Sequence, residues 1–451
     1  MKKVITLLLL SMLLTAQESV TQLKLEQVSR VIDSTFSEET VKTQGKTEIE
    51  DDAFVDNVQV LQKPSVDEET PGNLILNSSV TSNESEIHQG LTNVKSGAKL
   101  QDSQLESVNE IKSLEANSGA SFVSQGNVII GDDSNVSHIV NSANENLVED
   151  GTADKLTVLQ HNSLEDTEIK NTTIHQGLIV ITNGADVSNL NVTQQNSIKR
   201  SDMSGQGEIN ATQVTQGQIK IEESMGRSIT QNVQNEIDNL MIDDSSSVNQ
   251  AYLHASKSDL NNMNEQLNNS NTQDIVKNEM NNVEMENALI NQDVLFIDNS
   301  SINRINKYNR GSGLQQNNLI HSTMLENNAT INQSTITIQE GSTVTDLEYF
   351  TAKNPRNDQD AINEIKVVEL GQDTVLYQDR LELNNATLEE SSLHRTNSIK
   401  NVNISNESNV YQFYTQLTDS EMQDSKLSDK SYLKDVSIND SAIVQGMTTV
   451  K

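Results

Sequence analysis

An eight-residue motif recurs ten times along this 451-residue chain. Its pattern is apolar-x-Gln-x-x-[VILT]-x-[VILA], as in VSQGNVII, IHQGLIVI and INQSTITI, and successive copies lie 33 to 51 residues apart. Because a short unit cannot bury its own apolar face, repeated units must stack on their neighbours and form an elongated array. The motif glutamines are Gln89, Gln125, Gln176, Gln216, Gln250, Gln292, Gln333, Gln378, Gln412 and Gln445.

Between the motif copies, apolar residues recur at steps of five or six. This step fits neither a helix of 3.6 residues per turn nor the two-residue alternation of a long strand. The intervals are filled mainly by Asn, Asp and Ser, which tolerate turn geometry and hydrogen-bond to nearby backbone. The pattern therefore predicts a chain that turns a corner every five or six residues. After Gln412 the apolar positions are Leu417, Met422, Leu427, Leu433, Ile438 and Ile443.

Short strands with apolar residues inside and polar corners outside predict an all-β fold, a parallel β-solenoid, over residues 76–451. Residues 351–366 lack the rhythm and are expected to form an irregular loop. Only three prolines occur in the chain, so nearly every backbone N–H is available for pairing between rungs. With about 20 residues per coil, the domain would make about 18 rungs and a rod of roughly 85 Å.

The position of each motif glutamine leaves two interpretations open. Residues at −2, 0, +3 and +5 relative to the glutamine are expected to face inward, which requires a corner just after the glutamine. An inward amide is costly without a partner, but stacked glutamines can donate and accept along the array axis. The alternative is that the glutamines lie on a solvated strand face and recur through duplication alone.

The first residues are typical of a secretory signal peptide, predicted over residues 1–16. Lys2 and Lys3 precede an apolar run at 4–14 that is too short to span a bilayer. We expect the mature chain to be secreted, extracellular or at the cell surface, without membrane insertion. Residues 17–75 are acidic, carry no copy of the motif and are expected to form a partly disordered leader or adaptor. Cysteine is absent, so stability must come from stacking.

The formal charge of −34 makes nucleic acid an unsuitable partner, because no basic patch is available for phosphate. No EF-hand loop or glycine-rich Ca²⁺ repeat is present, which leaves only diffuse Ca²⁺ binding open. The seven histidines show no metal-ligand spacing, and no P-loop or GxSxG motif occurs. With no Trp, and with 6 Phe and 7 Tyr spread along the chain, a sugar-cleaving groove is not indicated. We therefore expect no enzyme, no catalytic residues and no cofactor.

The copies NATINQSTITI, NATQVTQGQIKI and SSVNQAYLHA resemble the curlin-type repeats of bacterial functional amyloid. The resemblance implies strand-turn-strand rungs with internal Gln and Asn ladders, and subunits that polymerise outside the cell into adhesive biofilm fibres. This chain departs from that pattern in its 19 glycines and its longer, more variable spacing.

Taken together, these features predict an exported structural or adhesive subunit of a curli-like fibre. It would associate with itself or with a related fibre subunit. The last residues follow a complete motif without an evident polar cap, so end-to-end assembly is expected. The alternative is a monomeric surface adhesin or carbohydrate-binding rod with a surface or polysaccharide ligand. A β-helix polysaccharide lyase or hydrolase is the remaining, less favoured possibility.

Overall fold

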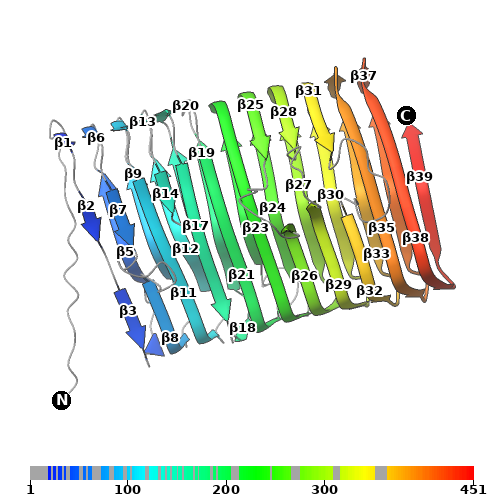
Figure 1. Ribbon diagram of the computed structural model, residues 1–451, viewed down its shortest axis with the longest axis horizontal. Helices are drawn as coiled ribbons and strands as arrows, with labels where there is room; N and C mark the ends of the chain where they lie inside the picture. Colours follow the sequence, from blue (N-terminus) through cyan, green and yellow to red (C-terminus); the bar gives the residue numbers. More distant parts are fainter. Residues whose placement is uncertain are drawn as a thin grey trace.

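A computed structural model of the chain describes strand backbone in segments between residues 19 and 451. It describes side chains mainly in residues 215–226, 235–261, 278–305, 318–349 and 363–451, with isolated residues and short gaps besides. The expected signal peptide at 1–16 and residues 351–362 of the expected loop lie outside the described residues. The described elements are β-strands without helices, all paired in parallel, so the predicted parallel β-solenoid is confirmed. Figure 1 shows the strands side by side, in sequence order along the long axis of the molecule.

The strands form two sheets that run the length of the solenoid. The first, called here the glutamine sheet, has 12 described strands and carries the motif. Its strands are β5 (Val41–Ile49), β9 (Glu86–Val94), β12 (Ser121–Ile130), β15 (Glu145–Glu149), β19 (Thr172–Thr182), β22 (Gln213–Glu222), β24 (Ser247–Ser256), β27 (Leu289–Asp298), β30 (Thr330–Gln339), β33 (Val375–Asn384), β36 (Asn409–Thr418) and β39 (Ala442–Val450).

The second, called here the larger sheet, has 27 described strands and completes each coil. Its strands are β1 (Ser19–Thr21), β2 (Lys24–Glu26), β3 (Ser29–Ile32), β4 (Thr35–Phe36), β6 (Phe54–Asp56), β7 (Gln59–Gln62), β8 (Asn73–Val80), β10 (Lys99–Gln101), β11 (Gln104–Ala116), β13 (Ser134–Ser137), β14 (Val140–Ser142), β16 (Gly151–Asp154), β17 (Thr157–Glu165), β18 (Glu168–Lys170), β20 (Asp186–Ser188), β21 (Asn191–Ser204), β23 (Met225–Asp243), β25 (Asp259–Glu265), β26 (Ile275–Glu286), β28 (Ser301–Lys307), β29 (Gln315–Glu326), β31 (Thr343–Phe350), β32 (Asn363–Leu370), β34 (Thr387–Glu389), β35 (Ser392–Ser405), β37 (Glu421–Gln423) and β38 (Lys426–Asn439).

Each coil contains one copy of the motif. The chain passes along β27, then through β28 and β29 in the larger sheet, and returns in β30, which pairs with β27 in register. A coil therefore takes about twice the predicted 20 residues, and that prediction is wrong. The apolar step of five or six residues does count corners, but about five corners are needed to close one coil. The glutamine positions from Gln44 to Gln445 then span ten steps, or roughly 50 Å instead of 85 Å.

The corners are made by residues with positive φ. In the coil between Gln378 and Gln412 they are Asp379, Asn385, Glu390, Asn401 and the adjacent pair Asn406 and Glu407. The left-handed conformation costs most L-residues about 1–2 kcal/mol, and Asn and Asp adopt it most readily. This preference explains why Asn and Asp fill the intervals between apolar positions. The predicted corner after the glutamine is also present in the rungs from Gln216 on, with φ between 53° and 74° at the next residue, from Gly217 to Gly446.

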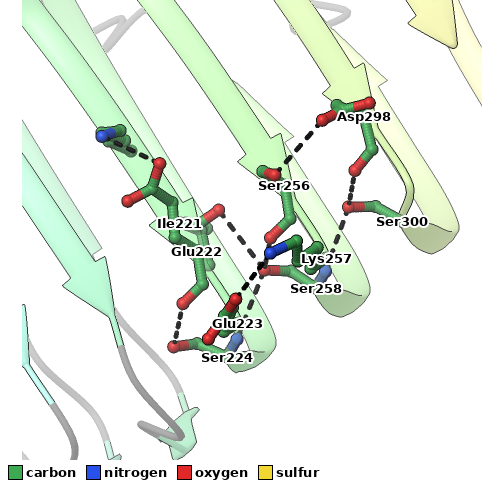
Figure 2. Close-up of polar contacts among 10 residues, drawn as sticks. Ile221, Glu222, Glu223, Ser224, Ser256, Lys257, Ser258, Asp298 and Ser300 are labelled. Carbon is green, nitrogen blue, oxygen red and sulfur yellow. Dashed lines mark hydrogen bonds and ion pairs between the residues drawn. The ribbon is translucent and has the colours of Figure 1, made fainter. Parts of the chain in front are cut away.

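Serine residues tie one corner to the next rung. Figure 2 shows Ser224, Ser258 and Ser300 in a column at the corner that follows the glutamine sheet. Each hydroxyl donates to the carbonyl two residues earlier at 2.7 Å. The backbone N–H of Ser258 donates to Oγ of Ser300 at 3.0 Å, and that of Ser224 to Oγ of Ser258 at 3.4 Å. The serine hydroxyls therefore satisfy backbone groups that the turn removes from the sheet.

The core consists of columns in which one side chain per rung occupies the same position. On β30 the residues at −2, 0, +3 and +5 are buried, as predicted: Ile331, Gln333, Ile336 and Ile338. Each fully buried aliphatic side chain contributes about 1.5–3 kcal/mol, so the columns stabilise stacking in proportion to the number of rungs. One column in the larger sheet consists of Ile198, Ile237, Met280, Ile320, Ile365 and Ile399.

Strand pairing continues across residue 75, where the sequence changes character. In the segment expected to be a leader, β5 pairs in register with β9 and places Gln44 opposite Gln89. Gln44 does not fit the motif because Lys42 occupies the apolar position two residues before it. The repeat therefore extends to an eleventh glutamine, while the role of residues 17–75 stays a prediction.

Val367 offers a test of the corner geometry. It has φ 51° and is 55% exposed, in the register position that Asn401 occupies one rung later with φ 53°. A β-branched residue is strained in this region, so Val367→Asn should stabilise the protein by about 1 kcal/mol. The reciprocal Asn401→Val should destabilise it by a similar amount. Urea unfolding of the three proteins measures both, and equal midpoints would contradict the assigned strain.

Candidate functional site

The glutamines of the motif form one continuous column inside the solenoid. All ten predicted residues occupy the same register position in the glutamine sheet, each opposite the glutamine of the next rung. From Gln216 on, each Nε2 donates to Oε1 of the preceding glutamine at 2.8–3.0 Å. Those described as buried, with 0–1% exposure, are Gln89, Gln176, Gln216, Gln250, Gln292, Gln333, Gln378 and Gln412.

This geometry corresponds to the stacked interpretation and not to a solvated face for the buried members. Gln445 lies in the last rung and is exposed, although it still donates to Gln412 at 3.0 Å. The side chain of Gln125 lies outside the described residues, and only its register is given. Each buried amide thus finds its donor and acceptor in copies of itself, which removes the cost of an unpaired buried polar group.

A second interior column consists of asparagines, a ladder that the curlin resemblance implies but whose residues no motif identified. Its members are exposed by 2% or less and are linked by Nδ2 to Oδ1 hydrogen bonds of 2.7–3.0 Å. Each precedes a core residue by two positions, so Asn-x-apolar at the coil spacing was the available signal. The members are Asn196, Asn235, Asn278, Asn318, Asn363 and Asn397.

The two columns have opposite polarity along the solenoid. Each glutamine donates to the preceding rung, whereas each asparagine donates to the following rung. The side-chain dipoles of the two columns therefore point in opposite directions. The dipoles within each column add up, and stacked amides also polarise one another. Because the two columns point in opposite directions, their electric fields partly cancel in the low-dielectric interior.

A buried polar network lies next to the glutamine column in the later rungs. In the rungs from Gln216 to Gln412 the residue after the glutamine is buried in the interior, and at one rung it is Asp379, which is 1% exposed. Asp379 accepts from the Tyr349 hydroxyl at 3.0 Å and from Nδ2 of Asn363 at 3.1 Å. Nη1 of Arg395 donates to the Asp379 carbonyl at 3.3 Å, and the same guanidinium binds Asp429 of the last rung at 2.8 and 2.7 Å.

Burial raises the pKa of Asp379 to about 7, against a partial lowering by the nearby Arg395 charge and the Tyr349 hydrogen bond. Burial also raises the pKa of Tyr349 well above its ordinary value. The Asp379 carboxyl therefore binds a proton on folding at mildly acidic pH. This arrangement couples stability to pH.

The last rung differs from the interior ones in exposure. Leu433 and Ile438 on β38 are 42% and 49% exposed, whereas Ile399 and Ile404, opposite them on β35, are 1% and 0% exposed. Val450 on β39 is 74% exposed. Among the described residues, β37, β38 and β39 each pair with a strand on one side only. Exposed apolar side chains, Gln445 and strands paired on one side therefore lie together on one surface of the described residues, called here the last-rung surface.

No group of three or more His, Cys, Asp or Glu side chains in the described segments is placed to hold a metal ion. No described helix is long and apolar enough to cross a membrane.

No family model matches the chain, and no curated protein matches it. The resemblance to curlin repeats therefore rests on the motif copies alone. Among solved structures, the chain is similar to PfbA, a surface adhesin of Streptococcus pneumoniae, with 9% identity over 86% of this chain and 85% of that chain. The TM-score is 0.22, which is too low for this likeness to bear on fold or function.

The glutamine column predicts a strong effect of Gln333→Lys. The ammonium group would replace an amide that is fully buried and bonded on both sides, leaving an unpaired charge in the core. Breaking such an arrangement costs about 3–5 kcal/mol. Thr337→Lys, on the outward side of the same strand, is the matched control and should cost much less. Thermal unfolding compares the two, and a similar loss in both would argue against the buried column.

Asp379 predicts a pH dependence of stability. Its folded pKa of about 7 exceeds the unfolded value near 3.9, so between these values only the folded state holds the proton. Stability should therefore fall as the pH rises from about 4 to 7. Asp379→Asn should remove this part of the slope, whereas Asp373→Asn at an exposed corner should retain it. Urea midpoints measured across this range test the assignment, and parallel profiles of wild type and Asp379→Asn would contradict it.

Proposed function

We propose that the chain is an exported, non-enzymatic, structural or adhesive β-solenoid that assembles end to end into an extracellular fibre of the curli type. The observation that carries the proposal is the in-register stacking of the rungs, in which each buried glutamine is satisfied by the same residue of its neighbours. Ile399 and Ile404, which lie opposite Leu433 and Ile438 one rung earlier, are buried because a stacked rung covers them. A rung supplied by a second copy in the same register would bury Leu433 and Ile438 in the same way and continue the glutamine column.

The polarity of the solenoid favours head-to-tail growth. All described strand pairs are parallel, so a second copy can continue both sheets only by placing its first rung on the last rung of its neighbour. Such a contact is heterologous and does not close, and contacts of this type generate filaments instead of small oligomers. Parallel edges with open N–H and C=O groups are effective templates for this kind of addition.

Charge opposes association through the sides. The chain carries a formal charge of −34, and the corners of the last coil include Asp419, Asp424, Asp435 and Asp440. Repulsion between rods should keep fibres apart at low salt, and diffuse binding of Ca²⁺ to the carboxylates would relieve it. Single fibres are therefore expected first, in a biofilm matrix or at a cell surface, with bundling at higher ionic strength.

Electron microscopy of residues 17–451 over a concentration series, with and without Ca²⁺, tests the proposal. Unbranched fibres whose length increases with concentration are expected, and added fragments should seed growth. The double variant Leu433→Asp/Ile438→Asp should abolish elongation, because it places charges where the next rung would bury apolar groups. Since both residues are exposed in the single chain, folding should be retained and can be checked by circular dichroism.

Met241→Asp is the matched control, because Met241 is 43% exposed on the side of the solenoid in β23. It should elongate as the wild type does. Isolated rods of roughly 50 Å at all concentrations would overturn the assembly proposal while leaving the solenoid intact. Equal inhibition by Met241→Asp would overturn the assignment of the contact to the last-rung surface.

A further inference from the structure

The outward face of the glutamine sheet gathers the aromatic residues of a chain that has few. Along these strands, buried residues alternate with half-buried ones on either side of the glutamine, and the half-buried ones form the outer face. The chain has 6 Phe, 7 Tyr and no Trp. Five of these thirteen lie on this face between β24 and β36, although the sequence spreads them over more than 160 residues. They are Tyr252, Phe296, Tyr377, Tyr411 and Tyr414.

The aromatic side chains form two clusters. In the later one, the rings of Tyr377 and Tyr411 stack at 5.0 Å, and Tyr414 meets both edge-on. The guanidinium of Arg380 lies 4.8 Å from the Tyr377 ring centre and 5.8 Å from that of Tyr414. Its Nη2 also binds Glu382 at 2.6 Å. This cluster therefore offers ring surface and charged hydrogen-bonding groups side by side.

The earlier cluster lies on β24 and β27. His254 contacts the Phe296 ring at 5.0 Å and the Tyr252 ring at 6.2 Å, both edge-on. Burial is the main reason that the pKa of His254 is lowered, so the ring is neutral near pH 7. One rung, β30, separates the two clusters and contributes Asn332 and Thr335 to the face between them.

Polar atoms without partners converge on the same face. In the described part of the chain, five buried side-chain atoms lack a hydrogen-bond partner, and four of them belong to outward residues of the glutamine sheet. These four are Asp298 Oδ1, Asn332 Oδ1, Thr335 Oγ1 and Arg380 Nε. Pairing places Asn332 opposite Tyr377 and Thr335 opposite Arg380, so three of them adjoin the later cluster.

Such atoms are informative because leaving each one unpaired costs about 1–3 kcal/mol, and native proteins contain few of them. The carboxylate and amide oxygens accept, Arg380 Nε donates, and the hydroxyl of Thr335, which is 9% exposed, does both. A ligand that satisfies this set must present donors and acceptors together at close spacing. Sugar hydroxyl groups do so, and the apolar faces of sugar rings pack on aromatic side chains.

We propose that the outer face of the glutamine sheet, from β24 to β36, binds a neutral polysaccharide. The tyrosine rings pack on sugar rings, and hydroxyl groups of the polymer occupy the unpaired positions beside Asn332, Thr335 and Arg380. The Arg380 side chain, which is 30% exposed, turns outward on binding and opens these positions. The net charge of −34 repels a polyanion, which selects a neutral polymer. This site does not depend on end-to-end assembly, because stacking uses the ends and leaves this face free.

The test is retention of purified residues 17–451 on insoluble cellulose, chitin and starch, with alginate in affinity electrophoresis as the anionic arm. Wild type should bind at least one neutral polymer and not alginate. Tyr377→Ala/Tyr414→Ala should weaken that binding at least tenfold. Thr335→Val should weaken it about three- to tenfold, the factor of one hydrogen bond. Its thermal stability should be unchanged or higher, because an unpaired buried hydroxyl is removed.

Tyr432→Ala is the matched control, since Tyr432 is half-buried on β38 of the larger sheet, and its binding should equal that of wild type. Circular dichroism establishes that each variant is folded. Absence of retention on all three neutral polymers, or binding to alginate alone, would overturn the proposal. So would full binding by the folded Thr335→Val and Tyr377→Ala/Tyr414→Ala variants.

Discussion

The structure depends on the buried glutamine amide, whose hydrogen bonds come from the glutamine amides of the neighbouring rungs. Each glutamine from Gln216 to Gln412 donates to one neighbour and accepts from another, and the buried carboxyl groups described beside the column are those of Asp293 and Asp379. A shift of one residue would turn the whole strand over and place the amide outside. The column therefore fixes register at every rung. From Gln216 on, the coils vary between 33 residues, from Gln412 to Gln445, and 45 residues, from Gln333 to Gln378, because the variation is absorbed outside the motif.

A chain with only 34% apolar residues builds a regular core because its polar residues form the corners, where they redirect the strands and hydrogen-bond to the backbone. Left-handed residues redirect the strand about five times per coil, and serines such as Ser258 and Ser300 take up the backbone groups at the bends. The apolar residues need only fill a narrow interior. Stability is then a sum over neighbouring rungs, as in other repeat proteins, and does not require one large hydrophobic core.

The sequence predicts the local features of each rung, such as inward positions and corners. It does not predict features that depend on the number of residues in a coil. The inward positions around Gln333 and the corner at Ser334 follow from the motif itself. The coil length does not, since a regular corner spacing says nothing about how many corners close a coil. The residues of the asparagine ladder could not be identified in advance because Asn is abundant at corners, and only the Asn-x-apolar pairing separates Asn318 from its surface counterparts. The cluster of Tyr377 and Tyr411 could not be predicted because the coil length was not known, and these residues lie 34 positions apart in the sequence.

The two surfaces proposed to bind partners differ in whether the partner must match the register of the rungs. A partner at the last-rung surface must repeat the register of the column, so its chemistry is that of the chain itself. The outer face of the glutamine sheet carries no such constraint, and its residues change from rung to rung, from Phe296 to Thr337 to Glu382. That variation is compatible with contacts to a polymer that need not match the rung spacing. In a fibre assembled as proposed, every added copy would bring one more outer face, so weak contacts with a polysaccharide would combine into avid attachment.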